Sequence, residues 1–316
     1  MPVAVAEIAR RLGATAEWLN ELPDGTPLTI EHIALPSNAN RQSLSFLTEP
    51  ANADQANKAC AVLTLQAHAS LLDRPLVVAA LPLSIARAHQ WLPLADTASG
   101  GIRRTNIHPS AVIDQSVSIG EHSSVGANTV LCGDVRIGNF CDIEPNATII
   151  GPVALGNRVR IGANSVIGGQ SFTYVEDGEK WIKFPDLAAI KIHDGAEIGA
   201  GVTIDRGTLS ATVIGTGVIL DNQVHVGHGV SIGRDCAIAA KTVIAGEASI
   251  GEGCKIGGAC AIGEGVQITN DVTLLGMTGV SKSLHESGEY ASGWPAQPRR
   301  QWWRQLAKLK SLAKHK

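Results

Sequence analysis

The sequence has no long apolar run, no nucleotide-binding fingerprint and no cluster of metal-ligating residues. No stretch approaches the ~20 apolar residues of a membrane-spanning helix, and the N-terminus lacks the basic stretch and apolar segment of a secretory signal. Neither a P-loop nor a dinucleotide motif is present, and histidine and cysteine do not recur at metal-ligand spacing. We therefore expect a cytoplasmic protein with no integral membrane segment, no metal ion, no cofactor and no nucleic-acid partner.

The chain does have an aliphatic residue at every sixth position over most of its length. These positions run from Ile107 to Ile167, resume from Ile192 to Ile204, and continue from Ile214 to Val280. Hexapeptide repeats are typical of a parallel β-helix, in which three hexads make one triangular coil. The 26 positions predict a mostly β fold with between eight and nine coils.

The same repeat accounts for most of the cysteines. In the hexad Ile250–Lys255 we expect Ile250 to point into the core, Gly251 to permit the corner, and Cys254 to fill a small inward place. Four of the six cysteines occupy this fifth place of a hexad: Cys141, Cys236, Cys254 and Cys260. Their spacing fits neither disulfides nor zinc, so we expect reduced core side chains.

The first 100 residues lack the repeat and predict a small α/β domain. Val5–Leu12 has the pattern of an amphipathic helix, Leu76–Ala80 that of a buried strand, and Leu83–Leu92 that of a second helix. A short polar segment, Asp96–Gly101, marks the boundary. We expect three parts: an N-terminal α/β domain at 1–100, a hexapeptide-repeat β-helix at 101–285, and a C-terminal turn and helix at 286–316.

Residues 169–187 interrupt the repeat with aromatic and charged side chains. Loops that project from a rigid solenoid commonly carry binding function, although an insertion is also simply tolerated there. We favour the functional interpretation.

The C-terminal segment carries only positive charges. Trp303, Leu306, Leu309 and Leu312 have helical spacing after Pro298, which suits a helix start. From residue 290 onward there are seven cations and no acid: Arg299, Arg300, Arg304, Lys308, Lys310, Lys314 and Lys316. Such a helix fits an acidic partner or an anionic surface, or it packs its apolar stripe against neighbouring subunits. We expect both to apply in part.

Two histidines stand out as candidates for chemistry, because imidazole is well matched to proton transfer near neutral pH. His225 and His228 lie within the polar segment Asp221–Gly229 of an otherwise aliphatic repeat. His228 follows the inward Val226 by two places, so core packing does not explain it.

At this point the chain resembles the family of UDP-3-O-acylglucosamine N-acyltransferases of lipid A synthesis, over essentially its whole length. The features in order are the small N-terminal domain, the hexad helix, the stretch Thr203–Leu209, the segment Asp221–His228, the turn Ser292–Pro298 and the basic terminal helix. The resemblance implies a left-handed β-helix in a homotrimer, an exception to the usual right-handed crossover.

The resemblance also implies a reaction and roles for individual residues. An (R)-3-hydroxyacyl thioester on acyl carrier protein is attacked by the 2-amino group of a UDP-sugar, UDP-3-O-acylglucosamine. His228 matches the general base, and Gly246, 18 residues further on, matches the position whose backbone N–H binds the oxyanion. The remaining implied contacts are Phe46 with uridine, Asp221 near the sugar, Asn222, Gln223 and His225 lining the same cleft, and Arg299, Arg300 and Arg304 with the acidic carrier protein.

The chain departs from the family pattern at several places. Gly265 stands where the family often has a second histidine, and Gly229 follows His228 where asparagine is common. The Asp-Gly-Phe-Gly loop of the family reads Gln170–Thr173 here, in the order Gln-Ser-Phe-Thr. The uridine pattern Phe-x-x-Asn-Pro-x-Tyr becomes Phe46–Asn52, with Glu49 and Asn52 at the asparagine and tyrosine places.

Two alternatives stay open at the level of sequence. One is a related N-acyltransferase with a different amino-sugar nucleotide acceptor or a coenzyme A donor. The other is a catalytically silent scaffold or a metal-dependent hydratase, which would need three converging histidines where His225 and His228 supply two. Acyl chain length is set by side chains that cap a groove between subunits and is not predicted.

Overall fold

The computed structural model describes residues 2–21, 28–92, 106–293 and 296–312. The chain divides into two compact units, residues 1–102 (unit 1) and 103–316 (unit 2). The expected linker at 96–101 and the cations Lys314 and Lys316 lie outside the described residues, as do Trp294 and Pro295 of the expected turn.

Unit 1 is a small parallel sheet covered by helices. Its strands pair in the order β3-β4-β5-β6, every pair parallel. These strands are β3 (His32–Ile33), β4 (Ser43–Phe46), β5 (Ala61–Thr64) and β6 (Pro75–Val77), beside a short pair β1 (Val3–Ala4) and β2 (Thr29–Ile30). The helices are α1 (Val5–Leu12), α2 (Ala53–Ala56) and α3 (Leu81–His89), with 3₁₀ turns η1 (Glu17–Glu21), η2 (Pro36–Asn38), η3 (Pro50–Asn52) and η4 (Gln66–Leu71).

Hydrophobic periodicity explains these elements. In α1, Val5, Ile8 and Leu12 are buried, as the expected amphipathic spacing requires. Helix α3 begins at Leu81, two residues before the expected start, because Pro82 occupies the first turn, where its missing N–H is tolerated. The buried faces of α1 and α3 pack with the sheet residues Leu44, Leu63 and Leu76 in one core.

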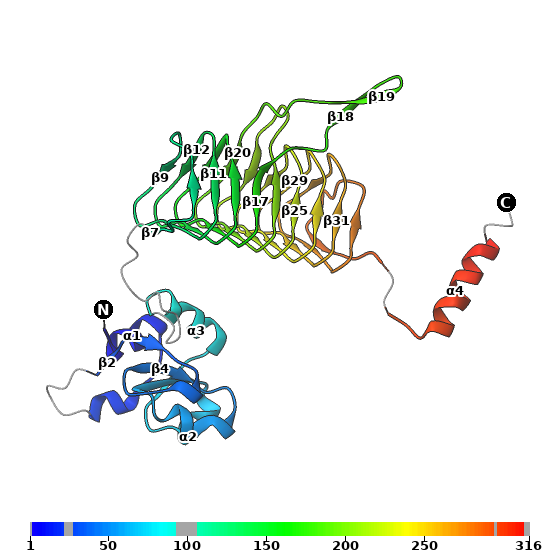
Figure 1. Ribbon diagram of the computed structural model, residues 1–316. Helices are drawn as coiled ribbons and strands as arrows, with labels where there is room; N and C mark the ends of the chain where they lie inside the picture. The colour runs from blue at the N-terminus through cyan, green and yellow to red at the C-terminus, as the bar shows by residue number, and fades with distance from the viewer. Residues whose placement is uncertain (1, 22–27, 93–105, 294–295, 313–316) are drawn as a thin grey trace. The chain divides into compact units, whose positions relative to one another are not determined.

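Unit 2 is a parallel β-helix with three sheets of ten, nine and eight strands among the described residues (Figure 1). The ten-stranded sheet comprises β7 (Asn106–Ile107), β10 (Ser124–Val125), β13 (Asp142–Ile143), β16 (Arg160–Ile161), β21 (Glu197–Ile198), β24 (Ile219–Leu220), β27 (Ala237–Ile238), β30 (Lys255–Ile256), β33 (Val272–Leu274) and β35 (Gly288–Tyr290). The nine-stranded sheet comprises β8 (Val112–Ile113), β11 (Val130–Cys132), β14 (Thr148–Ile150), β17 (Val166–Gly169), β22 (Thr203–Asp205), β25 (His225–Val226), β28 (Val243–Ile244), β31 (Ala261–Ile262) and β34 (Gly279–Val280).

The third sheet completes each triangular coil. It comprises β9 (Ser118–Ile119), β12 (Val135–Ile137), β15 (Val153–Leu155), β20 (Ile190–Ile192), β23 (Thr212–Ile214), β26 (Ser231–Ile232), β29 (Ser249–Ile250) and β32 (Gln267–Ile268). Successive coils stack in register, so that Ser231 pairs with Ser249 and Ile232 with Ile250. The mostly β fold with hexapeptide repeats is therefore confirmed.

The aliphatic hexad residues form the continuous core of unit 2. From Val125 to Val280 each of them is buried, whereas Ile107 at the first strand is 44% exposed. The four hexad cysteines Cys141, Cys236, Cys254 and Cys260 are buried and free, as expected. Burial raises the pKa of the Cys141 and Cys260 thiols, which makes them unreactive.

The repeat is interrupted after β17 by an antiparallel hairpin, β18 (Tyr174–Asp177) and β19 (Lys180–Lys183), which stands out from the stacked coils (Figure 1). Gly168 has a positive φ of 95°, and a Cβ there would overlap the Ile150 carbonyl oxygen. Glycine is therefore required where the chain leaves the coil. The coil resumes at β20, and a tight turn at Gly207–Ser210 follows β22.

The C-terminal part contains one helix, α4 (Arg299–Leu312). Among the described residues, no helix combines the length and apolar character needed to cross a membrane.

Candidate active site

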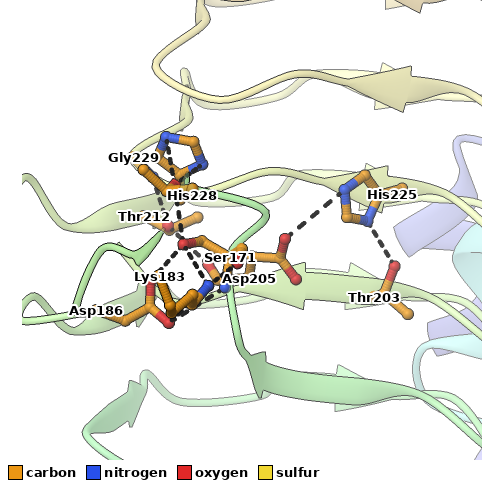
Figure 2. A network of polar contacts seen from close by, with 10 residues as sticks. Ser171, Lys183, Asp186, Thr203, Asp205, Thr212, His225, His228 and Gly229 are labelled. Carbon is orange, nitrogen blue, oxygen red and sulfur yellow. Dashed lines mark hydrogen bonds and ion pairs between the residues drawn. The ribbon is translucent and has the colours of Figure 1, made fainter. Parts of the chain in front are cut away.

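The two histidines of the Asp221–Gly229 segment come from one coil and occupy different places on it. Val226 points into the core, so His225, its neighbour on β25, points outward from the nine-stranded sheet. The chain then turns at Gly227 and places His228 at the next corner, half-buried, before β26 begins. Figure 2 shows both imidazoles on the outer surface of the coils.

Gly246 lies directly beside the His228 imidazole. The two residues are 18 positions apart, which is one coil, and the Glu247 N–H donates to the His228 carbonyl oxygen at 2.8 Å. A Cβ built on Gly246 would overlap His228 Cε1 and lie 2.6 Å from both ring nitrogens. Only glycine therefore leaves room for the imidazole in this position.

The corners of the solenoid differ in whether their N–H groups have a side-chain acceptor. At the corners of Glu121, Asn139 and Glu252 the N–H donates to a side-chain oxygen of the following coil, at 2.8 to 2.9 Å. Within the part of the chain that the structure describes, the Gly246 N–H has no such acceptor. A donor without a protein partner, placed against a base, can bind an oxygen of a substrate.

The irregular loop after β17 folds back onto His228. Thr173 Oγ1 is 3.4 Å from both ring nitrogens of His228 and 2.9 Å from Ser171 Oγ. Ser171 Oγ donates to Asp186, and the Ser171 N–H donates to the other oxygen of the same carboxylate at 3.2 Å. Lys183 Nζ donates to the Ser171 carbonyl oxygen and lies 3.8 Å from Asp186 (Figure 2).

His225 has its own partners on the neighbouring strand β22. Its Nδ1 is 2.8 Å from Thr203 Oγ1, and its Nε2 is 3.8 Å from Asp205 Oδ2. Asp205 has a side chain only 14% exposed, and burial raises the pKa of its carboxyl. The charges of His225, His228 and Lys183 act in the opposite direction, toward a lower pKa.

These groups can accept a proton and stabilise a developing oxyanion. His228 is the accessible base, and the Gly246 N–H is the adjacent donor. No group of three or more potential ligands suited to a metal ion occurs among the residues described. The arrangement suits acyl transfer through a tetrahedral intermediate.

Comparison with known proteins agrees with this chemistry. Residues 134–169 and 211–246 match the family model for the bacterial transferase hexapeptide (six repeats). The UDP-3-O-acylglucosamine N-acyltransferase of Pseudomonas syringae pv. tomato is 35% identical, over 96% of this chain and 92% of that protein. The Pseudomonas fluorescens enzyme of the same name is 34% identical, over 96% of this chain and 91% of that protein. The chain belongs to the UDP-3-O-acylglucosamine N-acyltransferase family.

Two further similarities cover smaller parts of the chain. The UDP-3-O-acylglucosamine N-acyltransferase of Idiomarina loihiensis is 51% identical over 148 residues, which is 47% of this chain and 43% of that protein. A UDP-N-acetylglucosamine acyltransferase from Bacteroides fragilis has a similar structure, with TM-score 0.53 and 27% identity over 59% of this chain and 71% of that one. The resemblance seen in the sequence is thus confirmed, and the chain is a hexapeptide-repeat acyltransferase.

The other expected sugar contacts of this family member lie one corner before His228. Asp221 accepts from the N–H groups of Asn222 at 2.7 Å and Ala240 at 3.1 Å. The side chain of Asn222 accepts from the Ala200 N–H at 2.8 Å, and Gln223 has a left-handed φ of 60° at the turn. All three residues therefore help to form the corner, and all three are also exposed. Asp221 and Asn222 line a pocket of about 330 Å³ together with residues of β16, β21 and β24.

The expected nucleotide contacts lie in unit 1. Phe46 ends β4 and is partly buried against the unit 1 core, while Glu49 precedes η3 and is exposed. Asn52, at the end of η3, is half-buried. Unit 1 therefore has a partly buried Phe46 and, three positions later, an exposed carboxylate at Glu49.

The expected carrier-protein contacts lie on α4. Arg299, Arg300 and Arg304 are all exposed on this helix. Trp303 and Leu309 of the apolar stripe are exposed as well, at 57% and 47%. The described part of α4 thus presents both a basic and an apolar surface.

Sequence reasoning missed Ser171, Thr173, Lys183 and Asp186 as individual site residues. It identified only the interruption at 169–187 as a candidate for function. Their positions depend on how the loop folds back, and no periodic pattern encodes this. Asp205 lies in the stretch Thr203–Leu209, which resembles the family, so the sequence did point to this region.

Proposed function

We propose that this protein transfers an (R)-3-hydroxyacyl chain from acyl carrier protein to the 2-amino group of UDP-3-O-acylglucosamine, in the cytoplasm, as a homotrimer. The observation that carries the proposal is the pairing of His228 with Gly246. The imidazole lies against a glycine whose Cβ would displace it and whose N–H has no acceptor among the described residues.

The chemistry follows from these two groups. The amine nitrogen attacks the thioester carbonyl carbon, a C–N bond forms, and the carbonyl oxygen becomes an oxyanion. The Gly246 N–H donates a hydrogen bond to this oxyanion while His228 accepts the proton lost by the amine. When the tetrahedral intermediate collapses, the C–S bond breaks and the His228 imidazolium returns the proton to the leaving thiolate.

A changed acceptor is the second candidate, and Glu49 is the observation that favours it. Its carboxylate is exposed, three positions after Phe46, at a place where the family pattern has an amide. A carboxylate accepts hydrogen bonds but donates none, and it repels the phosphates of a nucleotide. A carboxylate at this position would suit an acyl-acceptor substrate that carries an additional hydrogen-bond donor.

One assay tests the donor and the acceptor together. The enzyme is incubated with UDP-3-O-acylglucosamine, a mixture of hydroxyacyl carrier proteins and hydroxyacyl coenzyme A, and the product is identified by mass spectrometry. We expect an amide-linked product whose acyl chain comes from the carrier protein. A product formed only from coenzyme A, or only with another amino-sugar nucleotide, would support the second candidate.

The assignment of the base is tested in the same assay. His228→Ala should lower kcat by about 10² to 10⁴, the usual range for loss of a general base, while the folded protein keeps its thermal midpoint because His228 fills no core position. His225→Ala should have a smaller effect, since Thr203 and Asp205 hold that ring away from the Gly246 N–H. A larger loss for His225→Ala than for His228→Ala would contradict the assignment.

A further inference from the structure

Three side chains of the irregular loop form a row that leads from His228 to a buried carboxylate. Thr173 Oγ1 is 3.4 Å from the ring nitrogens of His228, and Ser171 Oγ is 2.9 Å from Thr173 Oγ1. Ser171 Oγ in turn contacts Asp186 Oδ1. Figure 2 shows Ser171 and Asp186 on the loop beside the His228 imidazole.

The directions of these hydrogen bonds follow from the donors available. An ionised carboxylate can only accept, so the single hydroxyl proton of Ser171 is donated to Asp186. Ser171 Oγ then accepts from the Thr173 hydroxyl, because Thr173 has the only remaining proton between the two. The lone pairs of Thr173 Oγ1 are left facing the His228 ring, at the same distance of 3.4 Å from both nitrogens.

The carboxylate at the far end of the row is surrounded by donors. The Asp186 side chain is only 7% exposed, and an unpaired carboxylate at that depth would be costly. Lys183 lies 3.8 Å away and supplies the opposite charge, while the Ser171 N–H donates to Asp186 Oδ2. Lys183 also donates to the Ser171 carbonyl oxygen, which fixes the loop that carries both hydroxyls.

The two hydroxyls stand where the family loop has glycine. The family reads Asp-Gly-Phe-Gly, whereas this chain has Ser171 and Thr173 at the second and fourth places. A glycine at either place has no side chain to join the row. A chain with glycine at both places therefore cannot form this row.

We propose that Thr173, Ser171 and Asp186 are positioning residues for His228, which hold the imidazole in place and stabilise the imidazolium formed during acyl transfer. The proposal rests on the proposed function. No proton moves along the row. The amine's proton binds one ring nitrogen, the other ring nitrogen keeps its hydrogen, and the lone pairs of Thr173 Oγ1 face the positive charge of the ring.

Hydrogen bonds of catalytic groups are often long in the free enzyme and shorten when substrate is bound. A ring N–H of an imidazolium is a charge-assisted donor, and bonds from such donors are shorter and stronger than neutral ones. The row is therefore placed to stabilise the positive charge that His228 gains during acyl transfer.

The experiment compares Thr173→Val with Thr173→Ser in the acyl-transfer assay. Valine keeps the shape of threonine and removes the hydroxyl, so kcat should fall about tenfold, as is usual when a group that orients a functional histidine is removed. The KM values for both substrates should stay within about twofold, because the interaction forms in the transition state. Thr173→Ser keeps the hydroxyl and should recover most of the lost rate. Equal rates for Thr173→Val and the wild type, or equal losses in both variants, would overturn the proposal.

Two further measurements separate this proposal from the proposed function. In the His228→Ala background, Thr173→Val should cause no additional loss, because Thr173 acts through the imidazole. Long-range ¹H–¹⁵N spectra of histidine-labelled protein, with His228 assigned by its absence in His228→Ala, should show shifted His228 ring resonances in Thr173→Val relative to the wild type. An unchanged His228 spectrum would overturn the positioning role even if no acyl transfer were detected. A wild type inactive on every acceptor offered would instead count against the proposed function.

Discussion

At the residue scale, the lack of a side chain at Gly246 lets the His228 imidazole lie against the neighbouring coil. Gly246→Ala should displace the imidazole, because the added Cβ would lie 2.6 Å from both ring nitrogens of His228. The three nearest atoms all belong to the movable His228 side chain, so the free energy of unfolding should change by less than about 1 kcal/mol. We expect kcat to fall by about 10²-fold or more, comparable with loss of the base.

Gly276→Ala is the matched control for this variant. Gly276 follows the inward Leu274 by two places, as Gly246 follows Ile244, but a Cβ there would make only an ordinary contact of 3.4 Å with the Gly258 carbonyl oxygen. Its rate and thermal midpoint should match the wild type. If Gly246→Ala unfolded the protein, or left kcat unchanged, the close packing of His228 on Gly246 would not describe the enzyme in solution.

Asp205 provides a prediction about pH. Burial raises the pKa of its carboxyl above the ordinary value of 3.8, so the folded state binds this proton more tightly than the unfolded state. Ionisation of Asp205 therefore lowers the free energy of unfolding as pH rises from 3.8 to the folded pKa, and this contribution changes no further at higher pH. Asp205→Asn removes this cost. Its thermal midpoint should exceed that of the wild type at pH 7.5, with a smaller difference at pH 4.

Thermal unfolding of Asp205→Asn and Asp205→Glu across this pH range checks the assignment. The glutamate variant keeps an ionisable group and should retain the pH dependence, whereas the asparagine variant should lose it. A lower midpoint for Asp205→Asn at pH 7.5 would mean that attraction from His225, His228 and Lys183 outweighs burial.

The His228–Gly246 pairing could be predicted from sequence because a regular solenoid brings residues one coil apart in the sequence into contact. Residues 18 apart are stacked on neighbouring coils, so a motif match at 228 and 246 also specifies proximity. Ser171 and Asp186 follow no such rule. They meet because a loop of irregular sequence closes on itself, and the energetic balance of hydrogen bonds and burial in that loop has no periodic signature.

At the element scale, the strands were predictable wherever the hexad pattern is regular. The helices α1 and α4 were also predicted from their apolar spacing. The β18–β19 hairpin was not predicted as a hairpin, although the interruption itself was visible. Its strand residues are mostly exposed, so no alternating buried face reveals them.

Helix α4 allows a test of donor attraction. Arg299, Arg300 and Arg304 are exposed cations on a helix without acidic residues, and acyl carrier protein is acidic. Reversal of all three to Glu should raise the KM for the carrier-protein donor several-fold through loss of long-range attraction. The KM for the sugar nucleotide should hardly change and serves as the internal control. For the wild type, the donor KM should rise with salt, since charges are screened beyond about 8 Å at physiological ionic strength.

One outcome would contradict a role of α4 in attracting the carrier-protein donor. If the reversed variant has the same association state as the wild type and the same donor KM at low salt, the donor binds elsewhere. The apolar stripe of α4, with Trp303 and Leu309 exposed, would then indicate an assembly element.

At the scale of the whole molecule, unit 2 leaves large apolar side chains exposed near the site. Phe172 is 89% exposed, Leu209 is 75%, and Trp181 and Leu187 are each 68%. Two of these belong to adjoining segments, because the Leu187 N–H donates to the Thr208 carbonyl oxygen at 3.0 Å. Clustered apolar exposure on one side of a protein indicates a surface that another chain covers.

We expect the proposed homotrimer to cover this surface. The family resemblance implies the same assembly, with grooves between neighbouring subunits. Sedimentation equilibrium at micromolar concentration should therefore give three times the chain mass of 33.0 kDa. Trp181→Asp combined with Leu209→Asp places two charges on the exposed apolar side chains of unit 2, so the mass and the activity should fall together. Leu83→Asp, which adds a charge to an exposed leucine of unit 1, is the control for a general effect of surface charge. A wild-type monomer with full activity at this concentration would show that one chain forms a complete site, and the exposed apolar residues would then have to serve the substrate.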